Sequence, residues 1–500
     1  MRDLSHFHIP ALFTHSSPYS LYLKLSMLCL ALRSSLQVIS SDDEYQYAVG
    51  FKSLKLELRY RQSIRTHDTL YRPSAASFLK VGKPDTCLPA ATPKESSMVL
   101  EVRSLRKAAV PSTLIENPSP GNLQSTRLAL HVNEDGSSCL VYIASGCDVY
   151  KLLIPMDNSS VRKGKESLLI PVQTQAMDSS SLNRCPHRSE IQSIALSETE
   201  SPGYLVLGSV DDYGHLIVSK LDTSGKDIDQ LTYSVLPRDS GVGEGSWAGL
   251  CFSRSQWSMA AVARSFCKSI DVYDQDIHVR SLHTLWYPSS LNFLENSGHG
   301  SENSILAVAE GCQLTLWDLR MKENGGCLQR ISGSLGDIFY AVCSSSTGNV
   351  AVGGADRTVT IYDPRRLVVT IGLFGTVYGD RGFVYNSLGF SFLTSEVSFV
   401  TYDLWSPISR WVHCSKYEIT GLAFSSLDPD YIYIQGVDYE VLCAQWKECK
   451  KVFSFRGDSN WLGFSKCCNR DVVGGWCDSG SIFMADVGVK ESEINMVINL

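Results

Sequence analysis

The side chains most able to do chemistry include sixteen cysteines in a chain of 500 residues. Their spacings contain no Cys-x-x-Cys pair and no histidine at zinc-finger distance. Cys467 and Cys468 are adjacent, which suits neither a simple disulfide nor tetrahedral binding of one ion by both. Cysteines scattered in this way are typical of reduced thiols buried in strands. We therefore expect no metal site and a cytoplasmic or nuclear location, or both.

Motifs of catalysis are not found in the sequence. It has no Gly-x-Ser-x-Gly, no His-Glu-x-x-His, no phosphate-binding loop and no dinucleotide-binding motif. Histidine, aspartate and serine are plentiful, but a catalytic triad is defined by its arrangement in space, and no set stands out. We predict that the chain is not an enzyme and uses no cofactor.

Two stretches of sixteen residues share a more specific pattern, ILAVAEGCQLTLWDLR at 305–320 and VAVGGADRTVTIYDPR at 350–365. Each ends in an aromatic residue, an aspartate and an arginine two positions later: Trp317, Asp318 and Arg320 in one, Tyr362, Asp363 and Arg365 in the other. The arginines could bind carboxylate or carbonyl oxygens of a partner. Alternatively, each arginine could pair with its own aspartate, and the motif would then only cap a turn.

The elements around these motifs are predicted to be strands. Apolar residues alternate with other side chains at a period of two, and Gly, Asp and Ser separate the short runs. Seven segments repeat this pattern: 128–152, 191–221, 247–274, 291–320, 338–365, 419–446 and 460–487. The aromatic residues Tyr273, Trp317 and Tyr362 are 44 and 45 positions apart, which is typical of a four-stranded propeller blade.

The Trp-Asp and Tyr-Asp endings and the repeat length resemble the WD-repeat family over about residues 125–490. The resemblance implies an all-β, seven-bladed β-propeller, in which 99–105 could supply the strand that closes the ring. Asp356 matches the family's turn aspartate. The family's hydrogen-bonded set is hinted at only by His413, Asp438 and Trp446.

The domain organisation follows from this resemblance. We expect an irregular or partly disordered arm at 1–97, the propeller at 98–490 and a tail at 491–500. Loop insertions are expected at about 153–190 and 367–404, and the second could instead be an eighth, degenerate blade. The apolar run 25–32 is too short to span a membrane.

The resemblance also implies a function, that of a non-catalytic scaffold for protein–protein interactions in a multiprotein complex. The sixteen-residue pattern is similar to a box in WD-repeat receptors of cullin-RING ubiquitin ligases. The alternative is therefore a substrate receptor that binds the ligase adaptor through the two motifs. A net charge of −7 is a poor match to a polyanion, so we expect protein partners and neither nucleic acid nor membrane.

Overall fold

The computed structural model describes residues 99–490, with gaps. The gaps are 157–160, 183–186, 200–202, 224–231, 240–244, 255, 295–303, 334–336, 375–397 and 469, and only the backbone is described at 166, 232, 364–374 and 398–406. Within these residues no helix is long and apolar enough to cross a membrane. The expected arm at 1–97 and tail at 491–500 lie outside the described residues.

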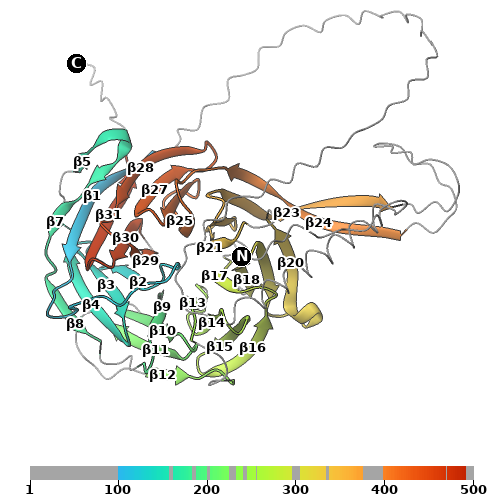
Figure 1. The fold of residues 1–500 in the computed structure, drawn as a ribbon, viewed down its shortest axis with the longest axis horizontal. Helices are drawn as coiled ribbons and strands as arrows, with labels where there is room; N and C mark the ends of the chain where they lie inside the picture. Colours follow the sequence, from blue (N-terminus) through green and yellow to red (C-terminus); the bar gives the residue numbers. More distant parts are fainter. Residues whose placement is uncertain are drawn as a thin grey trace, which may run out of the picture. The chain divides into compact units, whose positions relative to one another are not determined.

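Seven sheets stand as blades around a ring, and four strands in each pair antiparallel (Figure 1). We call the strands of each blade A to D, from the centre of the ring outward. The first three blades are β2 (Leu128–Val132), β3 (Ser138–Ser145), β4 (Asp148–Pro155) and β8 (Asp178–Ser181); β9 (Ile191–Glu198), β10 (Tyr204–Asp211), β11 (Leu216–Asp222) and β12 (Thr232–Val235); and β13 (Ala248–Phe252), β14 (Met259–Arg264), β15 (Ser269–Asp274) and β16 (Ile277–His283).

The next three blades follow the same order. They are β17 (Pro288–Phe293), β18 (Ile305–Glu310), β19 (Gln313–Asp318) and β20 (Cys327–Ser332); β21 (Phe339–Ser344), β22 (Val350–Gly354), β23 (Val359–Phe374) and β24 (Ser398–Trp411); and β25 (Ile419–Phe424), β26 (Tyr431–Gly436), β27 (Glu440–Gln445) and β28 (Lys450–Arg456). Each of the seven repeated segments supplies strands A to C of one blade. The all-β, seven-bladed propeller implied by the resemblance is therefore confirmed.

The seventh blade closes the ring with strands from both ends of the described chain. It combines β29 (Trp461–Lys466), β30 (Val472–Cys477) and β31 (Ser481–Val489) with β1 (Leu100–Ala109), which pairs antiparallel with β31. On its other edge β1 pairs in parallel with β7 (Val172–Thr174). This added strand covers the edge that the closing strand would otherwise expose.

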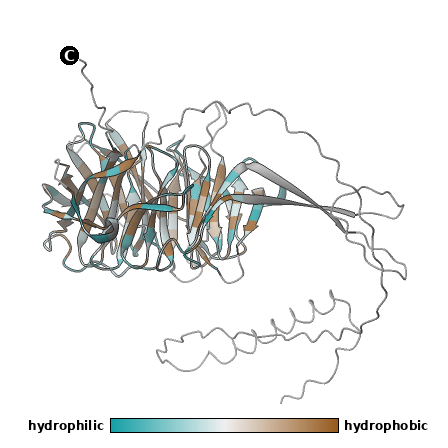
Figure 2. Cartoon of the chain, turned by 90° about the horizontal axis from the view of Figure 1, so that it is seen from above, coloured by the Kyte–Doolittle hydropathy of each residue, from teal (hydrophilic) through white to brown (hydrophobic). Residues whose placement is uncertain are grey.

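Neighbouring blades share their hydrophobic cores. All eight residues of β3 are buried, because alternate side chains face different neighbours. Val141 and Ile143 pack in one cluster with Trp476 of the seventh blade, whereas Tyr142 packs in another with Leu207 of the second. The strands are accordingly rich in apolar residues, as the colouring of Figure 2 shows.

The segment 153–190, where the sequence indicates a loop insertion, contains several short elements. Besides β7 and β8 it holds the hairpin β5 (Arg162–Lys163) and β6 (Leu169–Ile170), with the 3-10 turn η1 (Lys165–Ser167) between them. A second 3-10 turn, η2 (Glu323–Gly326), lies between β19 and β20. The segment thus completes the first blade through β8 and the closing blade through β7.

The segment 367–404 forms no blade in its described part. It lengthens strands C and D of the fifth blade into one hairpin, paired from Leu367 with Trp405 to Phe374 with Ser398. Figure 1 shows this hairpin extending outward from the ring. The eighth blade considered from the sequence is therefore absent from the described residues, and an extended C–D connection stands in its place.

Candidate protein-interaction faces

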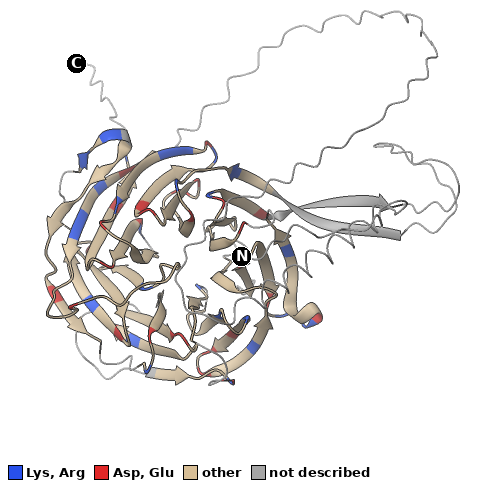
Figure 3. Ribbon diagram, viewed as in Figure 1, with Lys and Arg blue, Asp and Glu red and all other residues tan. Residues whose placement is uncertain are grey.

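The ring has two faces, which we name after their turns. The BC face carries the turns from strand B to strand C and the connections from each strand D to the next strand A. The AB face carries the turns from A to B and the connections from C to D. Backbone hydrogen bonds link the loops of the BC face, such as Gly311 N to Tyr287 O at 3.3 Å. Basic and acidic residues are interspersed around the ring (Figure 3).

The first Asp-x-Arg motif lies at the end of β19, on the AB face. Asp318 accepts hydrogen bonds from the backbone N–H of Arg320 at 2.9 Å, from its Nε at 3.0 Å and from its Nη2 at 2.9 Å. These bonds hold the pKa of Asp318 below its usual value. The Arg320 side chain remains 56% exposed. Local pairing of the arginine with its own aspartate therefore occurs in this motif.

The aromatic residues of both motifs face the interior. Trp317 is buried, and its Nε1 donates to Thr315 Oγ1 at 2.9 Å. Tyr362 is buried in the core between the fourth and fifth blades, and Asp363 is buried beside it. For Arg365 only the backbone is described, within β23. Of the six residues assigned to partner binding, Arg320 is the one whose side chain is described as exposed.

The residues proposed to fix turns have separate surroundings. Asp356 accepts the N–H of Thr358 at 3.1 Å within its turn, as a turn aspartate does. His413, Asp438 and Trp446 are not brought together. Asp438 precedes β27 and pairs with Arg456 at 3.2 Å, whereas Trp446 follows β27 and donates to Pro429 O at 2.8 Å. These two residues lie at opposite ends of β27, so the expected set does not form.

A hydrogen-bonded set of the expected kind occurs in the second blade. His187 lies 2.8 Å from Ser209 Oγ through Nε2 and 3.3 Å from Asp211 Oδ2 through Nδ1. The order serine, histidine, aspartate is that of a nucleophilic triad. All three side chains are buried, and the sequence motifs did not identify them because His187 lies in a loop, far along the chain from β10. The set therefore joins the loop to β10 without presenting a nucleophile to solvent.

Large apolar side chains are exposed mainly on the BC face. Three are consecutive in the loop between β16 and β17: Leu285, Trp286 and Tyr287 are 58%, 43% and 56% exposed. Phe266 in the preceding B–C turn and Ile338 before β21 are also exposed. We call these five residues the aromatic patch. Sequence reasoning missed it, although the signal was available: a Leu-Trp-Tyr run lies between repeated segments instead of within one.

A buried carboxylate holds the centre of the aromatic patch in place. Glu310 is fully buried at the end of β18, and its Oε2 accepts the backbone N–H groups of Leu285 at 2.7 Å and Trp286 at 2.9 Å. Its Oε1 accepts Arg330 Nη1 at 3.1 Å. Lys268 adds a cation–π contact, 4.7 Å from the centre of the Tyr287 ring. The loop thus presents its apolar side chains from a fixed backbone.

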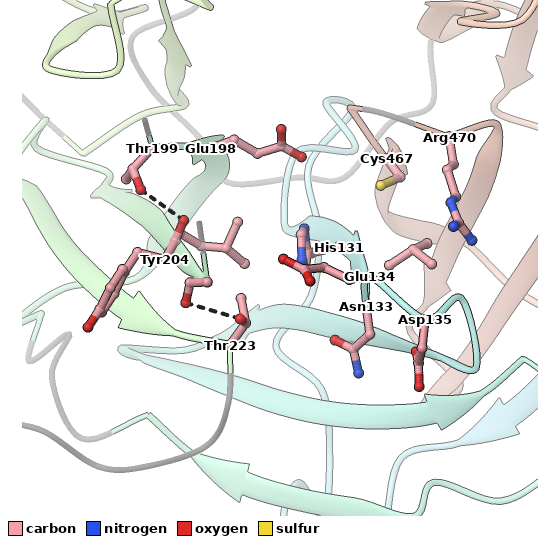
Figure 4. A pocket seen from close by; sticks show the side chains of 13 residues that line it. His131, Asn133, Glu134, Asp135, Glu198, Thr199, Tyr204, Thr223, Cys467 and Arg470 are labelled. Atoms are coloured by element: carbon pink, nitrogen blue, oxygen red, sulfur yellow. Dashed lines mark hydrogen bonds between the residues drawn. The ribbon is translucent and has the colours of Figure 1, made fainter. Parts of the chain in front are cut away.

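The AB face contains a polar pocket of about 600 Å³ between the seventh, first and second blades. Figure 4 shows Glu134 and Glu198 on its walls with His131 between them and Arg470 to one side. Burial lowers the pKa of His131, although the two glutamates oppose this shift. The pocket is lined by acidic and basic side chains. It contains none of the residues predicted to bind partners.

No protein-family model matches the chain, and no curated protein matches it. Among solved structures, the chain is similar to one from the structure described as "Crystal Structure of Mitotic Checkpoint Complex". The two are 12% identical with a TM-score of 0.49, and the match covers 83% of this chain and 98% of that chain. The propeller itself is established by the strand pairings of this chain.

Proposed function

We propose that the chain is a non-catalytic scaffold that binds protein partners through the aromatic patch on its BC face. The supporting observation is the exposure of Leu285, Trp286 and Tyr287 on a loop fixed by Glu310. Adjacent exposed apolar side chains mark interaction sites, and rigid aromatic residues are frequent hot spots of binding. We also propose that the scaffold works in a reducing compartment, the cytoplasm or nucleus; the burial of Cys139, Cys443 and others as free thiols supports this.

The test compares partner binding by wild type and by Trp286→Ala/Tyr287→Ala. Proteins recovered with wild type are purified, and their affinities for both forms are measured by calorimetry. We expect the double substitution to weaken binding by about 2 kcal/mol or more, or roughly thirtyfold. Folding should change little because Glu310 bonds the loop through backbone N–H groups, and a thermal melt checks this.

Arg320→Ala is the matched control, since it removes an exposed side chain from the opposite face. A partner that binds through the aromatic patch should bind this variant as it binds wild type. Equal affinity of every partner for wild type and for Trp286→Ala/Tyr287→Ala would refute the assignment to the BC face.

The second candidate is a substrate receptor of a cullin-RING ubiquitin ligase that docks through Arg320 and Arg365. The observation in its favour is the Arg320 guanidinium, which Asp318 orients while more than half of the side chain stays exposed. The Arg320→Ala/Arg365→Ala variant should then lose the ligase adaptor in affinity purification and keep its melting temperature. Binding should weaken by about 1–3 kcal/mol. Recovery of the adaptor at the wild-type level would exclude this candidate.

A further inference from the structure

Three metal-binding side chains converge in the second blade. His187 comes from the loop before β9, Asp211 from the end of β10 and His215 from the turn into β11. The distance from Asp211 Oδ2 to His187 Nδ1 is 3.3 Å, and to His215 Nδ1 it is 3.7 Å. One donor atom from each residue lies within 4.8 Å of the others, and this is the one such group among the described residues.

We propose that His187, Asp211 and His215 bind one transition metal ion of the zinc class. Zinc binds imidazole nitrogen and carboxylate oxygen at about 2.0–2.1 Å, which places ligand atoms of a tetrahedral site about 3.4 Å apart. The observed distances of 3.3 and 3.7 Å are close to this separation. The longer distance, between His215 and the carboxylate, exceeds the range of a direct hydrogen bond. An ion between these two groups would bind both of them.

The surrounding hydrogen bonds allow the buried histidine to act as a ligand. Without an ion, His187 Nδ1 lies 3.3 Å from Asp211 Oδ2 and can donate a hydrogen bond to it, while Nε2 lies 2.8 Å from Ser209 Oγ. With an ion on Nδ1, the proton moves to Nε2 and the ring donates to Ser209 Oγ. Ser209 can then donate to Ile217 O, which lies 3.4 Å from it. A proton on Nε2 leaves Nδ1 to the ion, and the bond to Ser209 holds the orientation of the ring.

The aspartate has one oxygen available for the ion. Its Oδ1 accepts the backbone N–H groups of Tyr213 at 3.1 Å and His215 at 3.0 Å, and Oδ2 faces both histidines.

Access to the site is through His215, whose side chain is 18% exposed, whereas that of His187 is fully buried. Three protein ligands leave the fourth tetrahedral position to water.

The test uses full-length, tag-free protein freed of metal with a chelator. Calorimetry with Zn²⁺ should give one equivalent bound, and Co²⁺ should give a tetrahedral visible spectrum without a thiolate charge-transfer band. His215→Gln should weaken binding by about tenfold or more. It should leave the melting temperature of the metal-free protein unchanged, because the bonds of His187 with Ser209 and Asp211 remain.

His278→Gln is the control, because His278 also lies beside an aspartate, with Nε2 3.5 Å from Asp271 Oδ1, but outside the site. Its affinity for Zn²⁺ should equal that of wild type. The proposal is overturned if wild type binds no Zn²⁺, if His215→Gln binds it as tightly as wild type does, or if the Co²⁺ spectrum shows thiolate ligands, which would assign the ion to the cysteines.

Discussion

Asp458 lies in the loop between β28 and β29. Its carboxylate bonds to β1 and β31, the two strands that close the ring. Its Oδ2 lies 2.7 Å from Lys107 Nζ of β1 and accepts Ser481 Oγ of β31 at 2.7 Å. Its Oδ1 accepts Ser479 Oγ at 2.7 Å. The carboxylate therefore bonds both strands of the closing pair, and these bonds stabilise its charged form.

These contacts predict how stability depends on pH. Burial opposes ionisation of Asp458, but the bonds from Lys107, Ser479 and Ser481 outweigh it and lower the pKa to about 2, from an ordinary value of 3.8. A lowered pKa in the folded state adds stability above the unfolded value, and that stability is lost as the pH falls through the folded value. Urea unfolding should show Asp458→Asn less stable than wild type above about pH 4, with the difference shrinking toward zero as the pH falls through about 2.

Asp478→Asn is the control for this prediction. Asp478 follows β30 and accepts a hydrogen bond at 2.9 Å from Nδ2 of Asn460, a residue outside the closing pair of β1 and β31. Its difference from wild type should be small across the same range of pH. A constant difference between wild type and Asp458→Asn from pH 4 to pH 2 would show that the charge does not stabilise the closure.

At the scale of single sites, the sequence predicts contacts between residues that are close together along the chain. Asp318 and Arg320 are two positions apart, and this spacing led to two alternatives: the arginine could bind a partner or pair with its own aspartate. The structure shows the local pairing. The set around His187 could not be predicted, because the loop that carries it must fold back onto β10 before the residues meet. The sequence pattern instead indicated His413 together with Asp438 and Trp446. Those last two residues lie at opposite ends of β27, so this set does not form.

At the scale of elements, strands buried on both sides were predictable because their side chains must be apolar. The segment LVYIA within β3 is such a case. The strand β8, with the sequence DSSS, has no apolar residue, and its conformation follows from its pairing with β4. Strands of this kind depend on a neighbour and leave no pattern in the sequence.

The hairpin of β23 and β24 allows a test at this scale. Val359 to Ile361 pair with Trp411 to Ser409, and these pairs complete the fifth blade before the hairpin extends further. Deleting 367–404 and joining Arg366 to Trp405 should therefore leave the melting temperature unchanged, as a thermal melt would show. A lowered melting temperature would mean that the extension is an integral part of the ring.

At the scale of the whole molecule, each blade depends on its neighbours for a core. Ile270 and Val272 of the third blade share a cluster with Leu306 and Val308 of the fourth, and the first and seventh blades share another. An open array of repeats can lose its terminal units separately, but a closed ring has no terminal unit. Closure by β1 therefore links the stability of all seven blades.

We accordingly predict one cooperative unfolding transition that substitutions in distant blades shift together. Glu310→Ala in the fourth blade leaves two backbone N–H groups and Arg330 without their carboxylate, and should cost about 3 kcal/mol. Asp458→Asn weakens the seventh blade near neutral pH. In urea, tryptophan fluorescence and circular dichroism should follow the same single transition for wild type and both variants, with lower midpoints for the variants. A separate early transition in either variant would mean that a blade unfolds alone and that the ring does not couple its parts.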